Sequence, residues 1–127
     1  MKKLYALRGA AQCKNTQDDI CLQIGLMYDE LLGRNKLDAK DIVSCIFSIT
    51  QDLNAINPCT ALRKYLGVEI PNLAYALFSV QEPDVKNSLE RTVRVIVHCY
   101  LEEGAKPLHV YRNGTEVLVG LLEDVLI

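Results

Sequence analysis

The run from Thr92 to Tyr100, with the sequence TVRVIVHCY, is the strongest strand signal in the chain. It consists mainly of β-branched and apolar residues, which favour extended structure in a sheet. Arg94 interrupts this pattern, because an unpaired cation buried among valines would be costly. Alternation along a strand places Arg94 on the opposite face from Val93 and Val95. The sequence therefore predicts a sheet in which an anionic group, either a carboxylate of the protein or a ligand, meets Arg94.

The length of 127 residues predicts one domain over residues 1–127. Half of the residues are apolar, yet a monomer of this size buries only roughly two thirds of its unfolded surface, which favours oligomerisation. The net charge of −2, with both signs spread along the chain, argues against nucleic acid as a partner. No membrane span is expected, because no apolar run approaches the necessary length of about 18 residues. The first apolar run stops at Arg8, which does not fit a signal peptide.

The five cysteines predict free thiols in a reducing cytoplasm. Their number is odd, and no pair has the short spacing of a zinc or redox motif. The two histidines, His98 and His109, are not spaced to complete a zinc site. We therefore expect a cytoplasmic protein without a bound metal, in which most cysteines act as small buried apolar residues.

Capping signals predict two helices. A capping arrangement at Thr16 starts the first one, and apolar residues at helical spacing extend it to about Arg34. The second begins after Asn57, has Pro58 at its first position and ends at Gly67. Strands are expected at residues 3–10, 43–50, 73–80, 92–100 and 109–111.

The resulting order of elements, β-α-β-α-β-β-β, indicates an α+β fold with a mixed sheet and helices on one face. Turns are expected over residues 83–88 and at Asn113-Gly114, and residues 117–127 form an apolar tail. A sheet this apolar, built by so short a chain, favours a symmetric homo-oligomer whose sheets pack around a shared core.

Three arginines are candidates for binding an anion, and each also has a purely structural interpretation. Arg8 ends the first strand, where its planar fork suits a carboxylate, although it could be an ordinary surface arginine. Arg63 lies on the second helix and shares a face with Thr60, and that face could simply be solvated. Arg94 could pair with Glu82, which follows the third strand, in a salt bridge that only closes the sheet.

Two arguments favour a functional site over a structural bridge. Buried ion pairs stabilise a protein poorly compared with apolar packing. The chain also lacks a nucleophile–base pair, since Ser79 has no G-x-S-x-G surrounding, and it lacks a phosphate loop and a Rossmann glycine fingerprint. An enzyme built on these residues would need neither covalent chemistry nor a cofactor. It would bind a small polyanion and stabilise developing negative charge.

Six short motifs follow one another along the chain from Arg8 to about Leu118. They are Leu7-Arg8-Gly9-Ala10, Ser48-x-Thr50-x-Asp52-Leu53-x-Ala55, Pro58…Ala61-x-Arg63, Gln81-Glu82-x-Asp84-Val85, Arg94-Val95 and His109-Val110-Tyr111. In order and spacing these motifs resemble the monofunctional, barrel-type (Bacillus-type) chorismate mutases. No single motif is specific, whereas the combination of Arg8, Arg63, Glu82, Arg94 and Tyr111 is.

The resemblance implies a homotrimeric pseudo-α/β barrel with active sites in clefts between adjacent subunits. It also implies an isomerase of the shikimate pathway and aromatic amino acid biosynthesis. Such an enzyme converts chorismate to prephenate by a [3,3] pericyclic (Claisen) rearrangement, without cofactor, metal or covalent intermediate. By position, Arg94 resembles the arginine that contacts the ether oxygen and a carboxylate of chorismate. Glu82 resembles the carboxylate that accepts from the ring hydroxyl, and Arg8 and Tyr111 resemble the groups that hold the side-chain carboxylate.

The remaining substrate-binding positions implied by the resemblance are Arg63, Thr60, Asn57, Ser79 and Leu118. Arg63 and Thr60 would reach the ring end of the substrate from the neighbouring subunit. The family pattern has a cysteine where Ser79 stands, an aromatic residue where Asn57 stands and a lysine where Thr60 stands. We expect Ser79 to hydrogen-bond near the catalytic carboxylate, and the absence of the lysine removes one cation from the ring-carboxylate end.

Two alternative functions stay open. Imine and enamine deaminases share the trimeric architecture and also place an arginine in an intersubunit cleft, although their signature sequences are absent here. A non-catalytic trimeric module could use the same arginines to hold an anionic metabolite. Such a module would bind chorismate without turnover.

Overall fold

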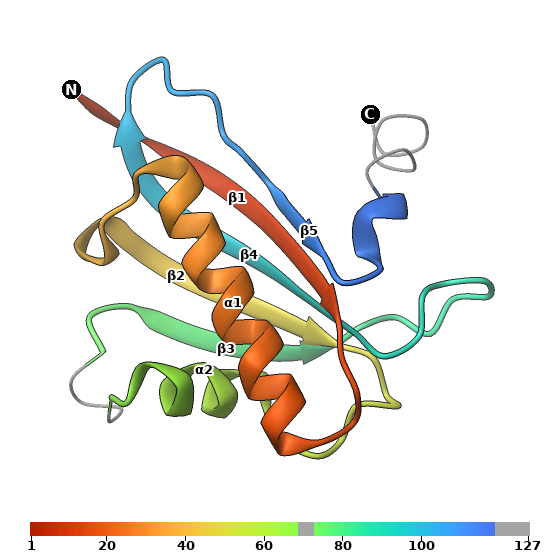
Figure 1. Cartoon of the computed structure of the whole chain (residues 1–127). Coiled ribbons are helices and arrows are strands. Elements are labelled where there is room, and N and C mark those ends of the chain that lie inside the picture. Colours follow the sequence, from red (N-terminus) through yellow and green to blue (C-terminus); the bar gives the residue numbers. More distant parts are fainter. Residues whose placement is uncertain (69–72, 119–127) are drawn as a thin grey trace.

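The computed structural model describes residues 1–68 and 73–118, and its five strands form one mixed sheet (Figure 1). The strand order is β3-β2-β4-β1-β5, with β4 antiparallel to β1 and β2, and with β1/β5 and β2/β3 parallel. The elements are β1 (Lys2–Gln12), α1 (Gln17–Asn35), η1 (Ala39–Asp41), β2 (Ile42–Ile49), α2 (Pro58–Leu66), β3 (Ala76–Gln81), β4 (Thr92–Glu102), β5 (Val110–Arg112) and η3 (Thr115–Val117). This order confirms the predicted α+β fold.

Both helices cover the same face of the sheet (Figure 1). Residues Ile20 and Ile24 of α1 and Leu62 of α2 belong to one buried cluster with alternate residues of the central strands, such as Val97. Gly9 on β1 lets α1 approach closely, because a Cβ there would lie 3.0 Å from both the Met27 sulfur and a Val95 methyl.

No α-helix covers the opposite face of the sheet in the described part of the chain (Figure 1). We call it the bare face, and the paired residues Arg8, Ile96, Ile46 and Phe78 form one row across it. Phe78 is 63% exposed there, which is a large apolar exposure for a strand residue.

The predicted helix ends are confirmed by their caps. The Thr16 hydroxyl accepts a hydrogen bond from the backbone N–H of Asp19 at 3.1 Å, and α1 follows directly. The Asn57 side chain accepts from the backbone N–H of Cys59 at 2.8 Å, and Pro58 occupies the first turn of α2. Gly67 ends α2 in the left-handed conformation, with φ of 68°.

The third predicted strand began too early. Residues 73–75 precede β3, because Tyr75 turns into the core, where its hydroxyl lies 2.6 Å from that of Tyr28. β1 and β4 extend further than predicted, since they pair along their whole length. The short strand expected at 109–111 begins one residue later. Of the apolar tail, Val117 lies in η3 and Leu118 is buried, while residues 119–127 lie outside the described residues.

All five cysteines are free, and four of them are buried, as expected for small apolar residues. Within the described ranges, no helix is long and apolar enough to cross a membrane.

Candidate active site

A second row of paired residues crosses the bare face and carries two of the predicted site residues. Tyr111 on β5 pairs with Ala10, Ala10 with Arg94, Arg94 with Ser48, and Ser48 with Val80. Paired residues on neighbouring strands project to the same side of a sheet. Arg94 and Tyr111 therefore project from the bare face, as alternation along β4 predicted for Arg94.

Arg94 forms an ion pair with Glu82, with 2.8 Å between Nε and Oε1. The predicted anionic partner is thus confirmed. The pair is not the fully buried bridge of the structural interpretation, because the Arg94 side chain is 44% exposed and the Glu82 side chain is 16% exposed. A pair this exposed contributes little stability. Its effect is to orient the guanidinium through Nε. Because the Arg94 side chain is partly exposed, its guanidinium can also meet an anionic ligand.

Glu82 is placed by the end of β3. Its backbone N–H donates to the carbonyl of Ile49 at 2.9 Å, which continues the ladder between β2 and β3. Pro83 follows and cannot donate to a further rung. Glu82 is therefore held at the strand end, on the same face as Val80 and Arg94.

Arg8 also lies on the bare face, where it pairs with Ile96, two residues along β4 from Arg94. Its backbone N–H donates to Nδ1 of His109 at 3.0 Å. Burial, together with the neighbouring charge of Arg8, lowers the pKa of His109 below its ordinary value. The imidazole is thus held neutral, with Nδ1 as the acceptor.

The Tyr111 hydroxyl is buried and has no hydrogen-bond partner among the described residues. A buried hydroxyl without a hydrogen-bond partner is costly, and in a binding site such a hydroxyl can donate to a bound ligand. The η3 turn packs against β1 and β5, and the Thr115 hydroxyl donates to the carbonyl of Ala10 at 3.0 Å. Leu118, directly after η3, is buried at this end of the sheet.

The other predicted residues gather around α2, on the helix-covered side. Arg63 Nη2 donates to the Thr60 hydroxyl at 3.3 Å. The Ser79 hydroxyl donates to the side-chain oxygen of Asn57 at 2.9 Å and lies 2.9 Å from the sulfur of Cys59. Burial raises the pKa of the Cys59 thiol, and the Ser79 bond and the Arg63 charge oppose that shift.

Ser79 was predicted to lie near Glu82, and this was wrong. Ser79 pairs with the buried Phe47, so it projects towards α2. Glu82 lies three positions after Ser79, and side chains alternate along a strand, so the two project to opposite faces of the sheet.

The structure thus divides the predicted residues into two groups. The bare-face group is Arg8, Glu82, Arg94 and Tyr111, and the α2 group is Asn57, Thr60, Arg63 and Ser79. Because the sheet separates the two groups, one chain does not bring them into a single cleft. Among residues 1–68 and 73–118, no cluster of three or more His, Cys, Asp or Glu side chains is arranged to hold a metal ion.

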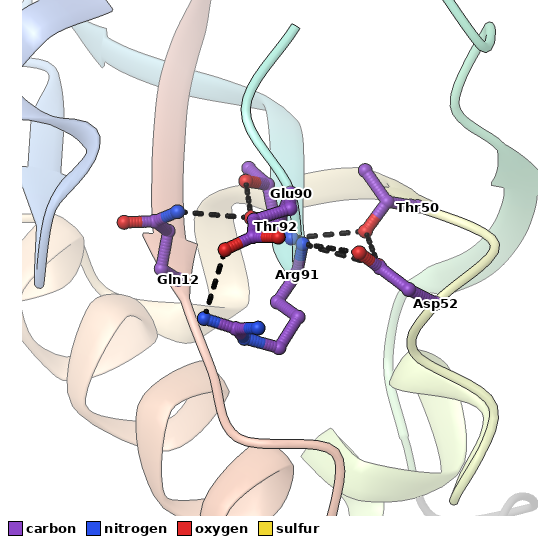
Figure 2. A network of polar contacts seen from close by, with 6 residues as sticks. All are labelled: Gln12, Thr50, Asp52, Glu90, Arg91 and Thr92. Carbon is purple, nitrogen blue, oxygen red and sulfur yellow. Dashed lines mark hydrogen bonds and ion pairs between the residues drawn. The ribbon is translucent and has the colours of Figure 1, made fainter.

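The sequence did not predict one feature beside the bare-face group, which is the contact between Asp52 and Arg91. The carboxylate of Asp52 accepts the backbone N–H of Arg91 with both oxygens, each at 3.0 Å (Figure 2). Thr50 and Asp52 belong to the motif Ser48-x-Thr50-x-Asp52, but their spacing predicted no role for them. Together with residues 82–90, they line a cavity of about 410 Å³ next to Glu82.

Comparisons with known proteins agree on one family. The family model described as chorismate mutase type I matches residues 4–119. The chain is 26% identical over 117 residues to chorismate mutase AroH of Bacillus subtilis (strain 168), covering 91% of this chain and 89% of that protein. It is also similar to the solved structure of a chorismate mutase from Clostridium thermocellum, with 35% identity and a TM-score of 0.78. That match covers 89% of this chain and 98% of the other.

Proposed function

This chain belongs to the chorismate mutase type I family, and from this premise we propose that it converts chorismate to prephenate by a [3,3] pericyclic rearrangement. The bare-face group supports the proposal, because it offers two arginines, a phenol and a single carboxylate. Such a set can bind a dianion and stabilise developing charge without a covalent step. The reaction is an isomerisation and requires no cofactor.

Arg94 is the proposed catalytic cation. In the transition state the C–O bond breaks ahead of C–C bond formation, so negative charge develops on the ether oxygen. A fixed cation at that position stabilises the transition state more than the ground state. The observation that carries the proposal is the 2.8 Å pair with Glu82, which orients a guanidinium that is still 44% exposed on the bare face.

Glu82 is proposed to act twice. Its Oε1 holds Arg94, and its Oε2 is left to accept a hydrogen bond from the ring hydroxyl of chorismate. Arg8 and Tyr111 are proposed to hold the side-chain carboxylate, and the partnerless hydroxyl of Tyr111 supports this role. Holding the compact conformer of the substrate lowers the entropic part of the barrier. Leu118 would supply apolar contact at the same end.

We propose that the α2 group of a neighbouring subunit completes each site in a homotrimer. In this arrangement Arg63 and Thr60 reach the ring end of the substrate, and Asn57 and Ser79 line the same wall. The exposed apolar residues of the bare face support assembly, because an unpaired face of this kind favours burial against another subunit. They include Leu4, Phe78, Val80 and Tyr100. Each subunit would contribute one domain, residues 1–127, to the barrel, and the free cysteines fit the cytoplasm.

Turnover of chorismate by the wild type and Arg94→Ala tests the proposal, with prephenate identified by its acid conversion to phenylpyruvate. We expect Arg94→Ala to lose about 10²–10³ in kcat, as for removal of one oxyanion donor. That factor corresponds to about 3–4 kcal/mol of transition-state stabilisation.

The matched control is Arg34→Ala. Arg34 is an exposed arginine on α1 that pairs with Glu30 at 2.9 Å, and we expect this variant to keep wild-type activity. Near-normal activity of Arg94→Ala would contradict the assigned mechanism. Binding of chorismate by the wild type without turnover would instead favour the non-catalytic metabolite-binding module.

A further inference from the structure

The ends of four strands meet around Asp52. Asp52 follows β2, and both of its carboxylate oxygens accept the backbone N–H of Arg91 at 3.0 Å (Figure 2). The Thr50 hydroxyl donates to Oδ1 of Asp52 at 2.5 Å and accepts the backbone N–H of Thr92 at 3.0 Å. Asp52 and Thr50 therefore tie the end of β2 to the start of β4.

Two further strands join this network. The Gln12 side chain, at the end of β1, donates to the carbonyl of Glu90 at 2.9 Å, and the Thr92 hydroxyl donates to the same carbonyl at 2.8 Å. At the end of β3, the N–H of Glu82 donates to the carbonyl of Ile49 at 2.9 Å. Both ends of the loop 83–90 are thus fastened to the end of β2, one to Ile49 and the other to Thr50 and Asp52 directly after the strand.

Arg91 has a backbone conformation that needs this support. Its φ is +43°, in the left-handed region that residues other than glycine rarely adopt. Arg91 directly precedes Thr92, the first residue of β4, and Arg94 lies three residues further on. The conformation at Arg91 therefore sets the path by which β4 leaves the loop and carries Arg94 towards Glu82.

We propose that Asp52 is a positioning residue for the reaction. By accepting the N–H of Arg91 with both oxygens, it holds Arg91 in the left-handed conformation and closes the base of the loop 83–90. This closure keeps Arg94 and Glu82 in register for their ion pair. Asp52 acts through the backbone and makes no contact with the reacting atoms. The inference rests on the proposed function, and Asp52 is not among the residues to which that function gives a role.

Steady-state kinetics of Asp52→Asn tests the proposal. The amide keeps the size of the side chain but replaces one acceptor oxygen by a donor, so Arg91 loses half of its anchor. We expect kcat to fall about 10–100-fold, the range produced by small misplacements of catalytic groups. KM should change much less, because Arg8 and Tyr111 still bind the substrate. The matched control is Asp84→Asn, an exposed carboxylate of the same loop, which should keep wild-type kcat.

Arg91→Gly separates positioning from general loss of structure. Glycine adopts positive φ without a steric cost, so this variant alone should retain activity, and in combination it should restore a large part of the kcat lost in Asp52→Asn. Normal kcat in folded Asp52→Asn would overturn the proposal. A loss of kcat that Arg91→Gly does not restore would overturn it too.

Native-state hydrogen exchange gives a readout that does not depend on turnover. In Asp52→Asn, the amides of Arg91 and Thr92 should exchange at least about tenfold faster, while those of α1 keep their wild-type rates. Unchanged exchange at Arg91 and Thr92 would overturn the positioning role. A wild type that shows the network but does not convert chorismate would be a failure of the proposed function instead.

Discussion

An arginine inside a valine-rich strand can avoid unpaired burial by meeting a carboxylate or by projecting from an uncovered face. Arg94 does both, since it pairs with Glu82 and lies on the bare face. The pairing followed from the sequence, because alternation and the position of Glu82 after a strand are local properties. The exposure did not, because it depends on which face the helices cover.

Arg94→Lys tests whether the site needs the shape of the guanidinium or only its charge. A lysine keeps the positive charge but has one donor centre, so it cannot bond Glu82 and the ether oxygen in the same geometry. We expect kcat to stay at least about tenfold below wild type, since part of the oxyanion stabilisation is lost. Wild-type kcat in Arg94→Lys would show that charge alone is sufficient.

His109 predicts a pH dependence of stability. Burial and the charge of Arg8 lower its pKa from the ordinary 6.5, so the folded protein resists a proton that the unfolded chain accepts. The free energy of unfolding should therefore fall as the pH drops below about 6.5. His109→Asn should remove this part of the fall, because its side-chain oxygen can replace Nδ1 as the acceptor of the Arg8 N–H.

Urea unfolding at pH 7.5 and pH 5.5 measures this effect. The matched control is His98→Asn, which changes the other histidine and leaves the bond between His109 and Arg8 in place. Equal losses of stability in wild type and His109→Asn between the two pH values would contradict the assignment.

The supporting residues of the site could not be predicted from the sequence. Asp52 acts on a backbone N–H 39 residues away, and His109 acts on one 101 residues away. Neither bond leaves a periodic signal, since the donor is the backbone and not a side chain. Ser79 has a different lesson, because residues that are close in sequence at a strand end still take opposite faces when they are three positions apart.

At the scale of elements, the ends of the helices were predictable because caps are local. Thr16, Asn57 and Gly67 each satisfy or complete groups within a few residues of themselves. Strand ends were less predictable, because pairing partners define them. β1 and β4 continue as far as Lys2 and Glu102 because they pair with each other.

Two glycines of α1 predict opposite effects for the same substitution. A Cβ at Gly25 would overlap the ring of Tyr65 on α2, whose hydroxyl donates to Asp29 at 2.6 Å. Gly25→Ala should therefore destabilise the fold by about 1–3 kcal/mol, as overpacking does. A Cβ at Gly33 meets no atom within 4 Å, so Gly33→Ala should stabilise by up to about 1 kcal/mol through helix propensity.

Thermal unfolding of the two variants checks this prediction. The substitution and the helix are the same in both, so the difference isolates the contact between α1 and α2. A higher melting temperature for Gly25→Ala than for Gly33→Ala would show that Tyr65 does not limit the approach of the two helices.

At the scale of the molecule, the order of elements predicted the fold class, and the comparisons place the fold in a known family. The structure describes a single chain and therefore does not show the assembly. The bare-face group and the α2 group lie on opposite sides of the sheet, so the site that we propose would need the α2 group of another subunit. The trimer and its shared sites accordingly stay a prediction.

Activity of mixed oligomers tests the shared site most directly. Arg94→Ala and Arg63→Ala should each have low activity in the chorismate assay, because each removes one side of every cleft. When equal amounts are unfolded together and refolded, random assembly of a cyclic trimer restores both arginines at about a quarter of the sites. The account predicts recovery to about a quarter of wild-type activity. Activity no greater than the average of the two parent variants would mean that the site does not draw Arg94 and Arg63 from different subunits.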